Sequence, residues 1–253
     1  METENITPQK NIVIFIHGFM GSPRVFDHLA KQVKGCGYDI DLITIAGHDE
    51  TIYKFFKTPS RMWSTSVEEY IDKMRLKYDN IVLITHSMGG LISVNHAVDN
   101  CDKIRHIIAI ALPVNIMPRL RLVKACLIYT FSKSSADKYV AAMRKQAGTH
   151  KITFYNSPLL LPKAIAFFRL SNLTKLKIHK LTVPITVINS SDDEMVGRRS
   201  LWHIKRIKEN LNLIELKHSG HFWFEDNERE MVTKAVLKVL KASLDEGADV
   251  NEC

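Results

Sequence analysis

Short apolar runs rich in β-branched residues recur along the chain and predict the strands of a sheet. Each run is apolar at consecutive positions rather than at alternate ones, which is typical of strands buried on both faces of a parallel sheet. The runs cover residues 11–16, 40–45, 81–85, 107–112, 185–189 and 213–216.

Stretches with the apolar spacing of helices lie between these runs. They cover residues 23–33, 61–78, 88–98, 198–209 and 228–244. Alternation of strand and helix predicts an α/β fold, with a mostly parallel sheet flanked by helices. A chain of 253 residues is within the range of one domain of this kind, so we expect a single domain over residues 1–253.

One interval interrupts the alternation. Roughly seventy residues separate the run ending at 112 from the run starting at 185, which is too long for a simple crossover. We predict a helical cap inserted at about residues 113–182, with two to four amphipathic helices. The predicted helix breaks are Pro118, Gly148, Pro158 and Pro162.

The cap is rich in apolar side chains, for which two interpretations stay open. They either line a pocket for an acyl chain or pack the cap onto the sheet. The side chains in question are Leu120, Leu122, Leu127, Ile128, Phe131, residues 159–161, Phe167 and Phe168.

The segment THSMGG, residues 85–90, joins a predicted strand to a predicted helix and has Ser87 at its centre. A sharp turn in this context places a serine hydroxyl at the carboxyl edge of a sheet. Gly89 and Gly90 allow the helix to pack close to the strand, and the start of the helix points N–H groups at the site. The alternative is that Ser87 is an ordinary N-cap residue.

A serine hydroxyl needs a base to become a strong nucleophile, and a histidine late in the chain would supply it. The segment HSGHF, residues 218–222, follows the last predicted strand and offers His218 and His221. A carboxylate that orients the histidine is expected after the preceding strand, where Asp192, Asp193 and Glu194 compete.

The string HSMGG, together with His17-Gly18-Phe19 after the first strand, resembles the α/β-hydrolase superfamily, in particular bacterial carboxylesterases and monoacylglycerol lipases. In that family a glycine precedes the catalytic histidine, which implies His221 as the base. The acid lies three residues before an apolar residue that is usually valine, which implies Asp193.

The resemblance also implies an oxyanion hole made by the backbone N–H groups of Phe19 and Met88. Thr85 departs from the pattern, because the family has glycine at this position.

The activity that the resemblance implies is hydrolysis of carboxylic esters with short or medium acyl chains, monoacylglycerols among them. The reaction would pass through an acyl-enzyme on Ser87 and needs no metal or organic cofactor. A thioesterase, an amidase or a C–C bond hydrolase would use the same triad. A non-catalytic binding protein on this fold is the alternative from a different class.

Charge and cysteine content change this picture little. The net charge is +8, and the nearest approach to a basic cluster lies between residues 119 and 180, either as a solvated face or as a weak contact with an acidic membrane surface. No nucleic-acid motif is present, so no nucleic-acid partner is expected. The four cysteines lack metal-ligand spacing and are expected to be reduced thiols.

No apolar run approaches the roughly 20 residues that cross a bilayer, and the N-terminus does not have the pattern of a signal peptide. We therefore expect a cytoplasmic protein.

Overall fold

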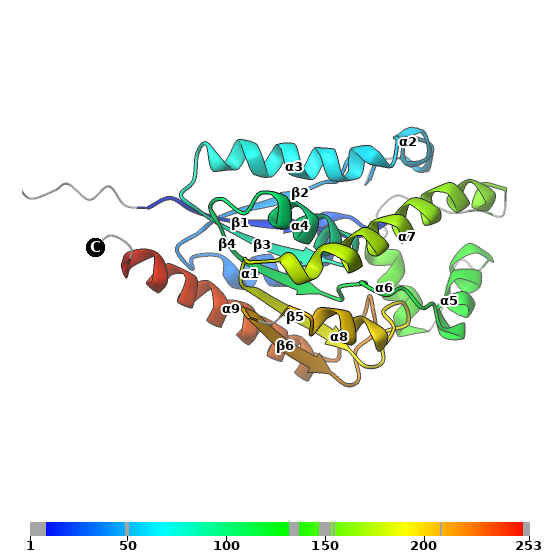
Figure 1. Ribbon diagram of the computed structural model, residues 1–253. Coiled ribbons are helices and arrows are strands. Elements are labelled where there is room, and N and C mark those ends of the chain that lie inside the picture. The colour runs from blue at the N-terminus through cyan, green and yellow to red at the C-terminus, as the bar shows by residue number, and fades with distance from the viewer. Residues whose placement is uncertain are drawn as a thin grey trace, which may run out of the picture.

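A six-stranded, fully parallel sheet forms the centre of the molecule (Figure 1). The computed structural model describes residues 9–48, 51–131, 137–146, 153, 155–207 and 209–249. The strand order is β2-β1-β3-β4-β5-β6. The strands are β1 (Asn11–Ile16), β2 (Asp39–Ile43), β3 (Asn80–His86), β4 (Ile104–Ile110), β5 (Ile185–Ser190) and β6 (Leu211–Leu216).

Helices cover both faces of this sheet, as the α/β pattern predicted. Apolar side chains of α3 and α4 pack on one face, and those of α1 and α9 pack on the other. Along β1, Ile12, Ile14 and Ile16 face the first layer while Val13 and Phe15 face the second. The helices are α1 (Asp27–Val33), α2 (Ile52–Lys57), α3 (Arg61–Arg75), α4 (Met88–Asp99), α5 (Leu120–Phe131), α6 (Lys138–Gln146), α7 (Leu160–Lys177), α8 (Arg199–Ile204) and α9 (Asp226–Asp249).

Burial on both faces holds for the interior strands only. Every residue of β3 is buried, and β1 and β5 each have a single position that is not. The expectation is wrong for β2 and β6, which form the two edges and keep several partly exposed residues. An edge strand lacks a neighbour on one side, so its apolar side chains cannot all be covered.

Several element bounds differ from the prediction. The helix α2 was not predicted, and α8 ends at Ile204, five residues earlier than predicted. Two elements begin earlier than predicted: β4 begins at Ile104 rather than at residue 107, and α9 begins at Asp226 rather than at residue 228. Local spacing locates the centres of elements, whereas tertiary contacts decide where they end.

Three helices, α5, α6 and α7, occupy most of the interval that we predicted to be a cap. Figure 1 shows α5 and α6 beyond the carboxyl ends of the strands, while α7 runs back over the sheet beside α4. Pro158 lies in a short 3-10 turn, Ser157–Leu159, directly before α7. The interpretation of residues 113–182 as a cap inserted into a single domain stays a proposal.

The predicted break at Pro162 is wrong, because this proline lies in the first turn of α7. A proline in the first turn removes no helical hydrogen bond, since N–H groups there have no partner within the helix. The predicted break at Gly148 lies outside the described residues.

Within the described part of the chain, no helix is both long enough and apolar enough to cross a membrane.

Candidate active site

Ser87 occupies the turn between β3 and α4 in a backbone conformation that is rare for residues other than glycine. Its φ is 52° and its ψ is −118°. Such a conformation costs on the order of 1–3 kcal/mol and persists only where the surroundings enforce it. Here the N–H of Ser87 donates to the carbonyl of Ile110 at 2.9 Å, which fixes the turn against β4.

Two glycines permit the close packing around this turn. A Cβ atom on Gly89 would lie 2.3 Å from the carbonyl oxygen of Ile16, so α4 can approach β1 only without a side chain there. A Cβ atom on Gly18 would lie 2.8 Å from the Cβ of Ser87. The chain after β1 therefore passes directly beside the serine.

Thr85, which departs from the family pattern, is accommodated by a buried hydrogen bond. Its hydroxyl donates to the carbonyl of Ile108 at 3.2 Å, and Gly90 opposite leaves room for it. The turn at Ser87 forms with threonine in this position.

The structure brings together the three side chains singled out in the sequence. His221 Nε2 lies 3.0 Å from Ser87 Oγ, and His221 Nδ1 lies 2.8 Å from Asp193 Oδ2. All three residues are buried. Ser87 follows β3, Asp193 follows β5 and His221 follows β6, so all three come from the carboxyl edge of the sheet.

The geometry separates Asp193 from its neighbour Asp192. Asp193 Oδ1 accepts the N–H groups of Met195 and Val196, both at 2.7 Å. Burial acts to raise the pKa of Asp193, but His221 and these two donors outweigh it and hold the pKa below its usual value. Asp192 instead points to solvent-exposed Arg121 and to Arg119.

Glu194, the third candidate acid, contacts the backbone of the histidine rather than its ring. Its Oε2 accepts the N–H of His221 at 2.9 Å, and its side chain is buried. Burial raises the pKa of this carboxyl above its usual value. A Cβ atom on Gly220 would lie 2.7 Å from Glu194 Oε1, so the glycine before His221 makes room for the carboxylate.

A second carboxylate that the sequence did not single out holds the same loop. Glu228, in the first turns of α9, accepts the N–H groups of Lys217 and His218 and the hydroxyl of Ser219. No local sequence pattern signals the contacts of Glu194 or Glu228, because each carboxylate meets groups of this loop only in the folded chain.

His17 and His86 each contact the backbone of a segment near the site. His17 Nε2 accepts the N–H of Ile45, which ties the end of β1 to the chain after β2. His86 Nε2 lies 3.0 Å from the carbonyl oxygen of His221. Burial, with a smaller effect of His221, lowers the pKa of His86 to about 3, so its ring is neutral at physiological pH.

The groups predicted to form an oxyanion hole lie beside the serine. Met88 is the first residue of α4, and the N–H groups of a helix's first turn have no acceptor within the helix. Phe19 follows Gly18, the residue whose backbone packs against Ser87. Their role as donors to an oxyanion stays a prediction.

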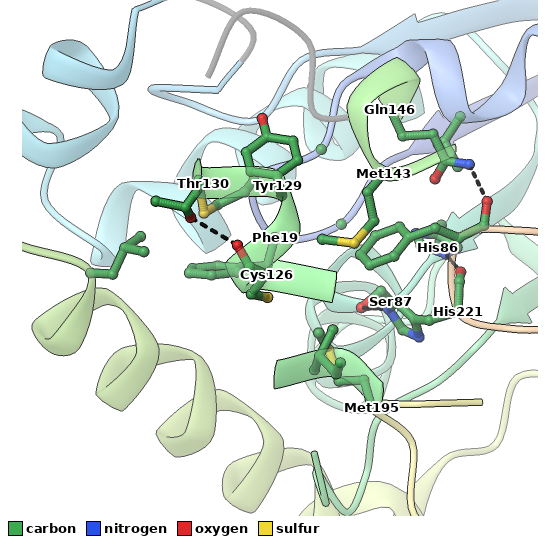
Figure 2. Close-up of a pocket in the computed structure, with 17 residues that line it drawn as sticks. Phe19, His86, Ser87, Cys126, Tyr129, Thr130, Met143, Gln146, Met195 and His221 are labelled. Carbon is green, nitrogen blue, oxygen red and sulfur yellow. Dashed lines mark hydrogen bonds between the residues drawn. The ribbon is translucent and has the colours of Figure 1, made fainter. Parts of the chain in front are cut away.

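A cavity of about 210 Å³ adjoins Ser87 and His221. Figure 2 shows Cys126, Tyr129 and Met143 gathered around it, with Phe19 and Met195. Its walls are mainly apolar and, among the described residues, include no aspartate or glutamate. The helices α5 and α6 contribute Leu122, Cys126, Tyr129, Thr130, Met143 and Gln146.

Most of the cap residues that were proposed to line an acyl pocket do not line the cavity. Only Leu122 and Leu160 line the cavity, while Phe167 is buried and stacks on Phe19 with ring centroids 5.1 Å apart. Ile128 packs within the small apolar cluster of α5 and α6. The remaining residues are exposed, so they neither line an acyl pocket nor pack the cap onto the sheet. They are Leu120, Leu127, Phe131, Leu159, Leu161 and Phe168.

Within the described residues no group of three or more histidine, cysteine and acidic side chains is placed to hold a metal ion.

The parallel sheet with helices on both faces and the serine in a strand-to-helix turn define the α/β-hydrolase fold. Residues 7–228 match the family model described as serine aminopeptidase, S33, so the chain belongs to this family of serine hydrolases.

A monoacylglycerol lipase with a similar sequence agrees with this assignment. The chain is 22% identical over 231 residues to a thermostable monoacylglycerol lipase of Bacillus sp. (strain H-257), covering 89% of this chain and 88% of the relative.

Among solved structures, it superimposes on a chain from the work on LipS and LipT, two metagenome-derived lipolytic enzymes, with a TM-score of 0.68 and 17% identity, covering 93% of this chain and 96% of that one. It also superimposes on the monoacylglycerol lipase of Paleococcus ferrophilus with a TM-score of 0.67 and 15% identity, covering 94% and 96%. At such identities the likeness extends to the fold alone.

Proposed function

We propose that the protein hydrolyses carboxylic esters through an acyl-enzyme intermediate on Ser87. The observation that carries the proposal is the continuous contact of Ser87, His221 and Asp193, at 3.0 and 2.8 Å, on the wall of an apolar cavity. Serine activated by a histidine that a carboxylate orients is the arrangement that acyl transfer requires.

In this mechanism His221 Nε2 takes the proton from Ser87 Oγ as the oxygen attacks the ester carbonyl carbon. Asp193 stays ionised and stabilises the imidazolium that forms. The histidine then gives its proton to the leaving alcohol, and the acyl group stays on Ser87. Water, activated by the same histidine, releases the acid and restores the serine.

The N–H groups of Phe19 and Met88 would bind the negative oxygen of the tetrahedral intermediate. Loss of one such donor typically costs about 3 kcal/mol of transition-state stabilisation. The positive φ of Ser87 supports this role for Met88, because the turn aims the start of α4 toward the serine.

The cavity suggests an acyl group of short or medium length as the substrate, with monoacylglycerols as candidates. Its mainly apolar wall suits an alkyl chain, for which each buried methylene contributes roughly 0.8 kcal/mol. The monoacylglycerol lipase of Bacillus sp. is a relative over most of both chains, which supports the same class.

An aminopeptidase activity, which the family description mentions, fits the cavity less well. A peptide bound through its free α-ammonium needs a carboxylate partner, since a buried unpaired charge is costly. In the part of the chain that the structure describes, no aspartate or glutamate lines the cavity. The sequence-based alternatives of thioester, amide or C–C bond cleavage use the same side chains and are separated by experiment.

The test is a panel of substrates under one set of conditions: p-nitrophenyl esters from two to sixteen carbons, a monoacylglycerol, an acyl thioester and an aminoacyl p-nitroanilide. The proposal predicts that kcat/KM is highest for an ester of short or medium chain. A preference for the thioester or the anilide would replace the proposed substrate class but not the catalytic serine. The cytoplasmic location expected from the sequence is part of the proposal, and cell fractionation tests it.

A further inference from the structure

The positive charge of the protein is concentrated in the predicted cap. Residues 113–182 include 13 lysines and arginines and a single acidic residue, Asp137. The rest of the chain has 22 basic and 26 acidic residues, so it is slightly negative. The net charge of +8 therefore comes from this segment, and the molecule is electrically asymmetric.

The same segment also exposes apolar side chains. Of 16 large apolar residues exposed in the described part of the chain, 12 lie between residues 117 and 176. On α5, Leu120 is 88% exposed, Leu127 is 54% exposed and Phe131 is 67% exposed. Single exposed apolar residues are ordinary, whereas a concentration of them marks an interaction surface.

These side chains share one face of α5. Leu120, Lys124, Leu127 and Phe131 follow each other at spacings of four, three and four, which places them along one side of a helix. On the opposite side Leu122 and Ala125 are buried, and Cys126, although exposed, forms part of the cavity wall. A solvent-facing helix side is normally polar. This one is apolar with a lysine in its centre.

The beginning of α7 has the same character. Leu161, Ile165 and Phe168 are exposed at spacings of four and three, while Lys163 and Phe167 on the other side are buried. Figure 1 shows α5 and the N-terminal end of α7 at the same end of the molecule, beyond the strands. We call these residues the cap face: Leu120, Lys124, Leu127, Phe131, Leu161, Ile165 and Phe168.

We propose that the cap face binds the surface of an anionic phospholipid membrane. Helices that lie at a lipid interface combine an apolar side, which enters the acyl boundary, with lysine and arginine that pair with anionic headgroups. Lys124 within the cap face and the surplus of basic residues in the segment 113–182 supply that charge complementarity. Since α5 lines the cavity with its inner side, binding would bring the cavity to within roughly one helix diameter, about 10 Å, of the lipid.

The experiment measures binding of the full chain to vesicles of phosphatidylcholine alone and of phosphatidylcholine with 30% phosphatidylserine, by flotation in a density gradient. We expect binding to the anionic vesicles, and roughly fivefold weaker binding for Lys124→Gln because a basic residue at such a surface contributes about that factor. We expect Leu127→Ser/Phe131→Ser to weaken binding about tenfold or more.

The matched control is Leu76→Ser/Trp202→Ser, which removes equally exposed apolar side chains outside the cap. It should bind vesicles as the wild type does. None of the cap-face variants lines the cavity, so hydrolysis of a soluble short-chain ester should be unchanged in all of them. This separates failure of the membrane proposal from failure of the proposed activity.

The proposal is wrong if the wild type binds neither kind of vesicle, or if the control loses binding as strongly as the cap-face double variant. It is also wrong if light scattering shows a dimer that the double variant dissociates while vesicles stay unbound. In that case a second copy of the chain covers the cap face.

Discussion

The segment after β5 offers three neighbouring carboxylates that differ in their main contacts. Asp193 lies against the ring of His221, Glu194 against its backbone N–H, and Asp192 against Arg119. Asp192 points toward solvent, whereas Asp193 and Glu194 are both buried, so residues adjacent in sequence have different environments.

Substitution of the two aspartates tests this assignment. An asparagine at 193 cannot hold His221 in the tautomer that accepts the serine proton, so Asp193→Asn should lower kcat by about 10⁴. Asp192→Asn removes only partly exposed ion pairs and should leave kcat within a few-fold of wild type. Steady-state kinetics on a p-nitrophenyl ester measures both, and a larger loss for Asp192→Asn would contradict the assignment.

Glu194 is predicted to position His221 by accepting its backbone N–H. Glu194→Ala removes this acceptor from a buried site, so we expect kcat to fall by about tenfold with little change in KM. Glu194→Gln keeps an acceptor oxygen and should restore most of the lost kcat. Equal losses of kcat in the two variants would show that the charge, not the hydrogen bond, is what matters.

Sequence alone located part of this site. Ser87 and His221 were identified by the elements that flank them and by the family resemblance. The resemblance also implied Asp193, which local pattern alone did not separate from Asp192, whereas the contacts of Glu194 and Glu228 are with backbone groups of the loop after β6. Contacts of that kind exist only in the folded chain.

At the scale of elements, α5 has two sides with different predicted roles. One side forms a wall of the cavity through Leu122, Cys126 and Tyr129, and the other is exposed. The apolar residues of this helix therefore do not share a single role, because those on one side form the cavity wall and those on the other side are exposed.

The cavity wall is predicted to set the length of the acyl chain. Cys126→Phe adds a ring to the wall and should shift the best p-nitrophenyl ester to a chain shorter by two or more carbons, because the cavity is only about 210 Å³. Leu127→Phe places the same ring on the exposed side of the same helix and should leave the preference unchanged. The account of the cavity would be wrong if both variants shifted the preference equally.

Elements were predicted where the pattern is long or continuous. The strands followed from apolar runs, but the sequence did not distinguish the edges β2 and β6 from the interior strands. The helix α2 is only six residues long, too short for its spacing to be read. Pro162 was misread because a proline is compatible with the first turn of a helix.

At the scale of the whole molecule, the buried His86 and the partly buried His106 make stability depend on pH. Burial lowers the pKa of His106 to about 4 and is the main cause that lowers the pKa of His86 to about 3. Both values lie below the ordinary value of 6.5. At pH values between the folded-state pKa and the ordinary pKa of these histidines, the unfolded chain binds protons that the folded chain does not. The free energy of unfolding therefore falls as the pH falls from about 6.5 to 4.

The variant His106→Gln should reduce this slope. Glutamine does not titrate, and its amide can approach Thr186, whose hydroxyl lies 2.9 Å from His106 Nε2. Urea unfolding at pH 7 and pH 4.5 should show that the variant loses less stability on acidification than wild type, by about 1–3 kcal/mol. Parallel losses in the two proteins would show that His106 contributes nothing to the pH dependence.

The fold class was predictable from the sequence because the alternation of strand and helix extends along most of the chain. The distribution of charge was less apparent, since a net value of +8 conceals a strongly basic segment and a slightly acidic remainder. In the folded chain, α5 and the N-terminal end of α7 lie at one end of the molecule, and this placement brings the exposed residues of the basic segment together (Figure 1).

The central claim is that Ser87 is the nucleophile, and covalent labelling tests it most directly. Wild type and Ser87→Ala would be treated with a fluorophosphonate, and intact mass and peptide mapping would locate the adduct. The account predicts one adduct, on Ser87, in the wild type and none in the variant, with ester hydrolysis lost in parallel. Absence of labelling in the wild type, or an adduct that persists in Ser87→Ala, would contradict it.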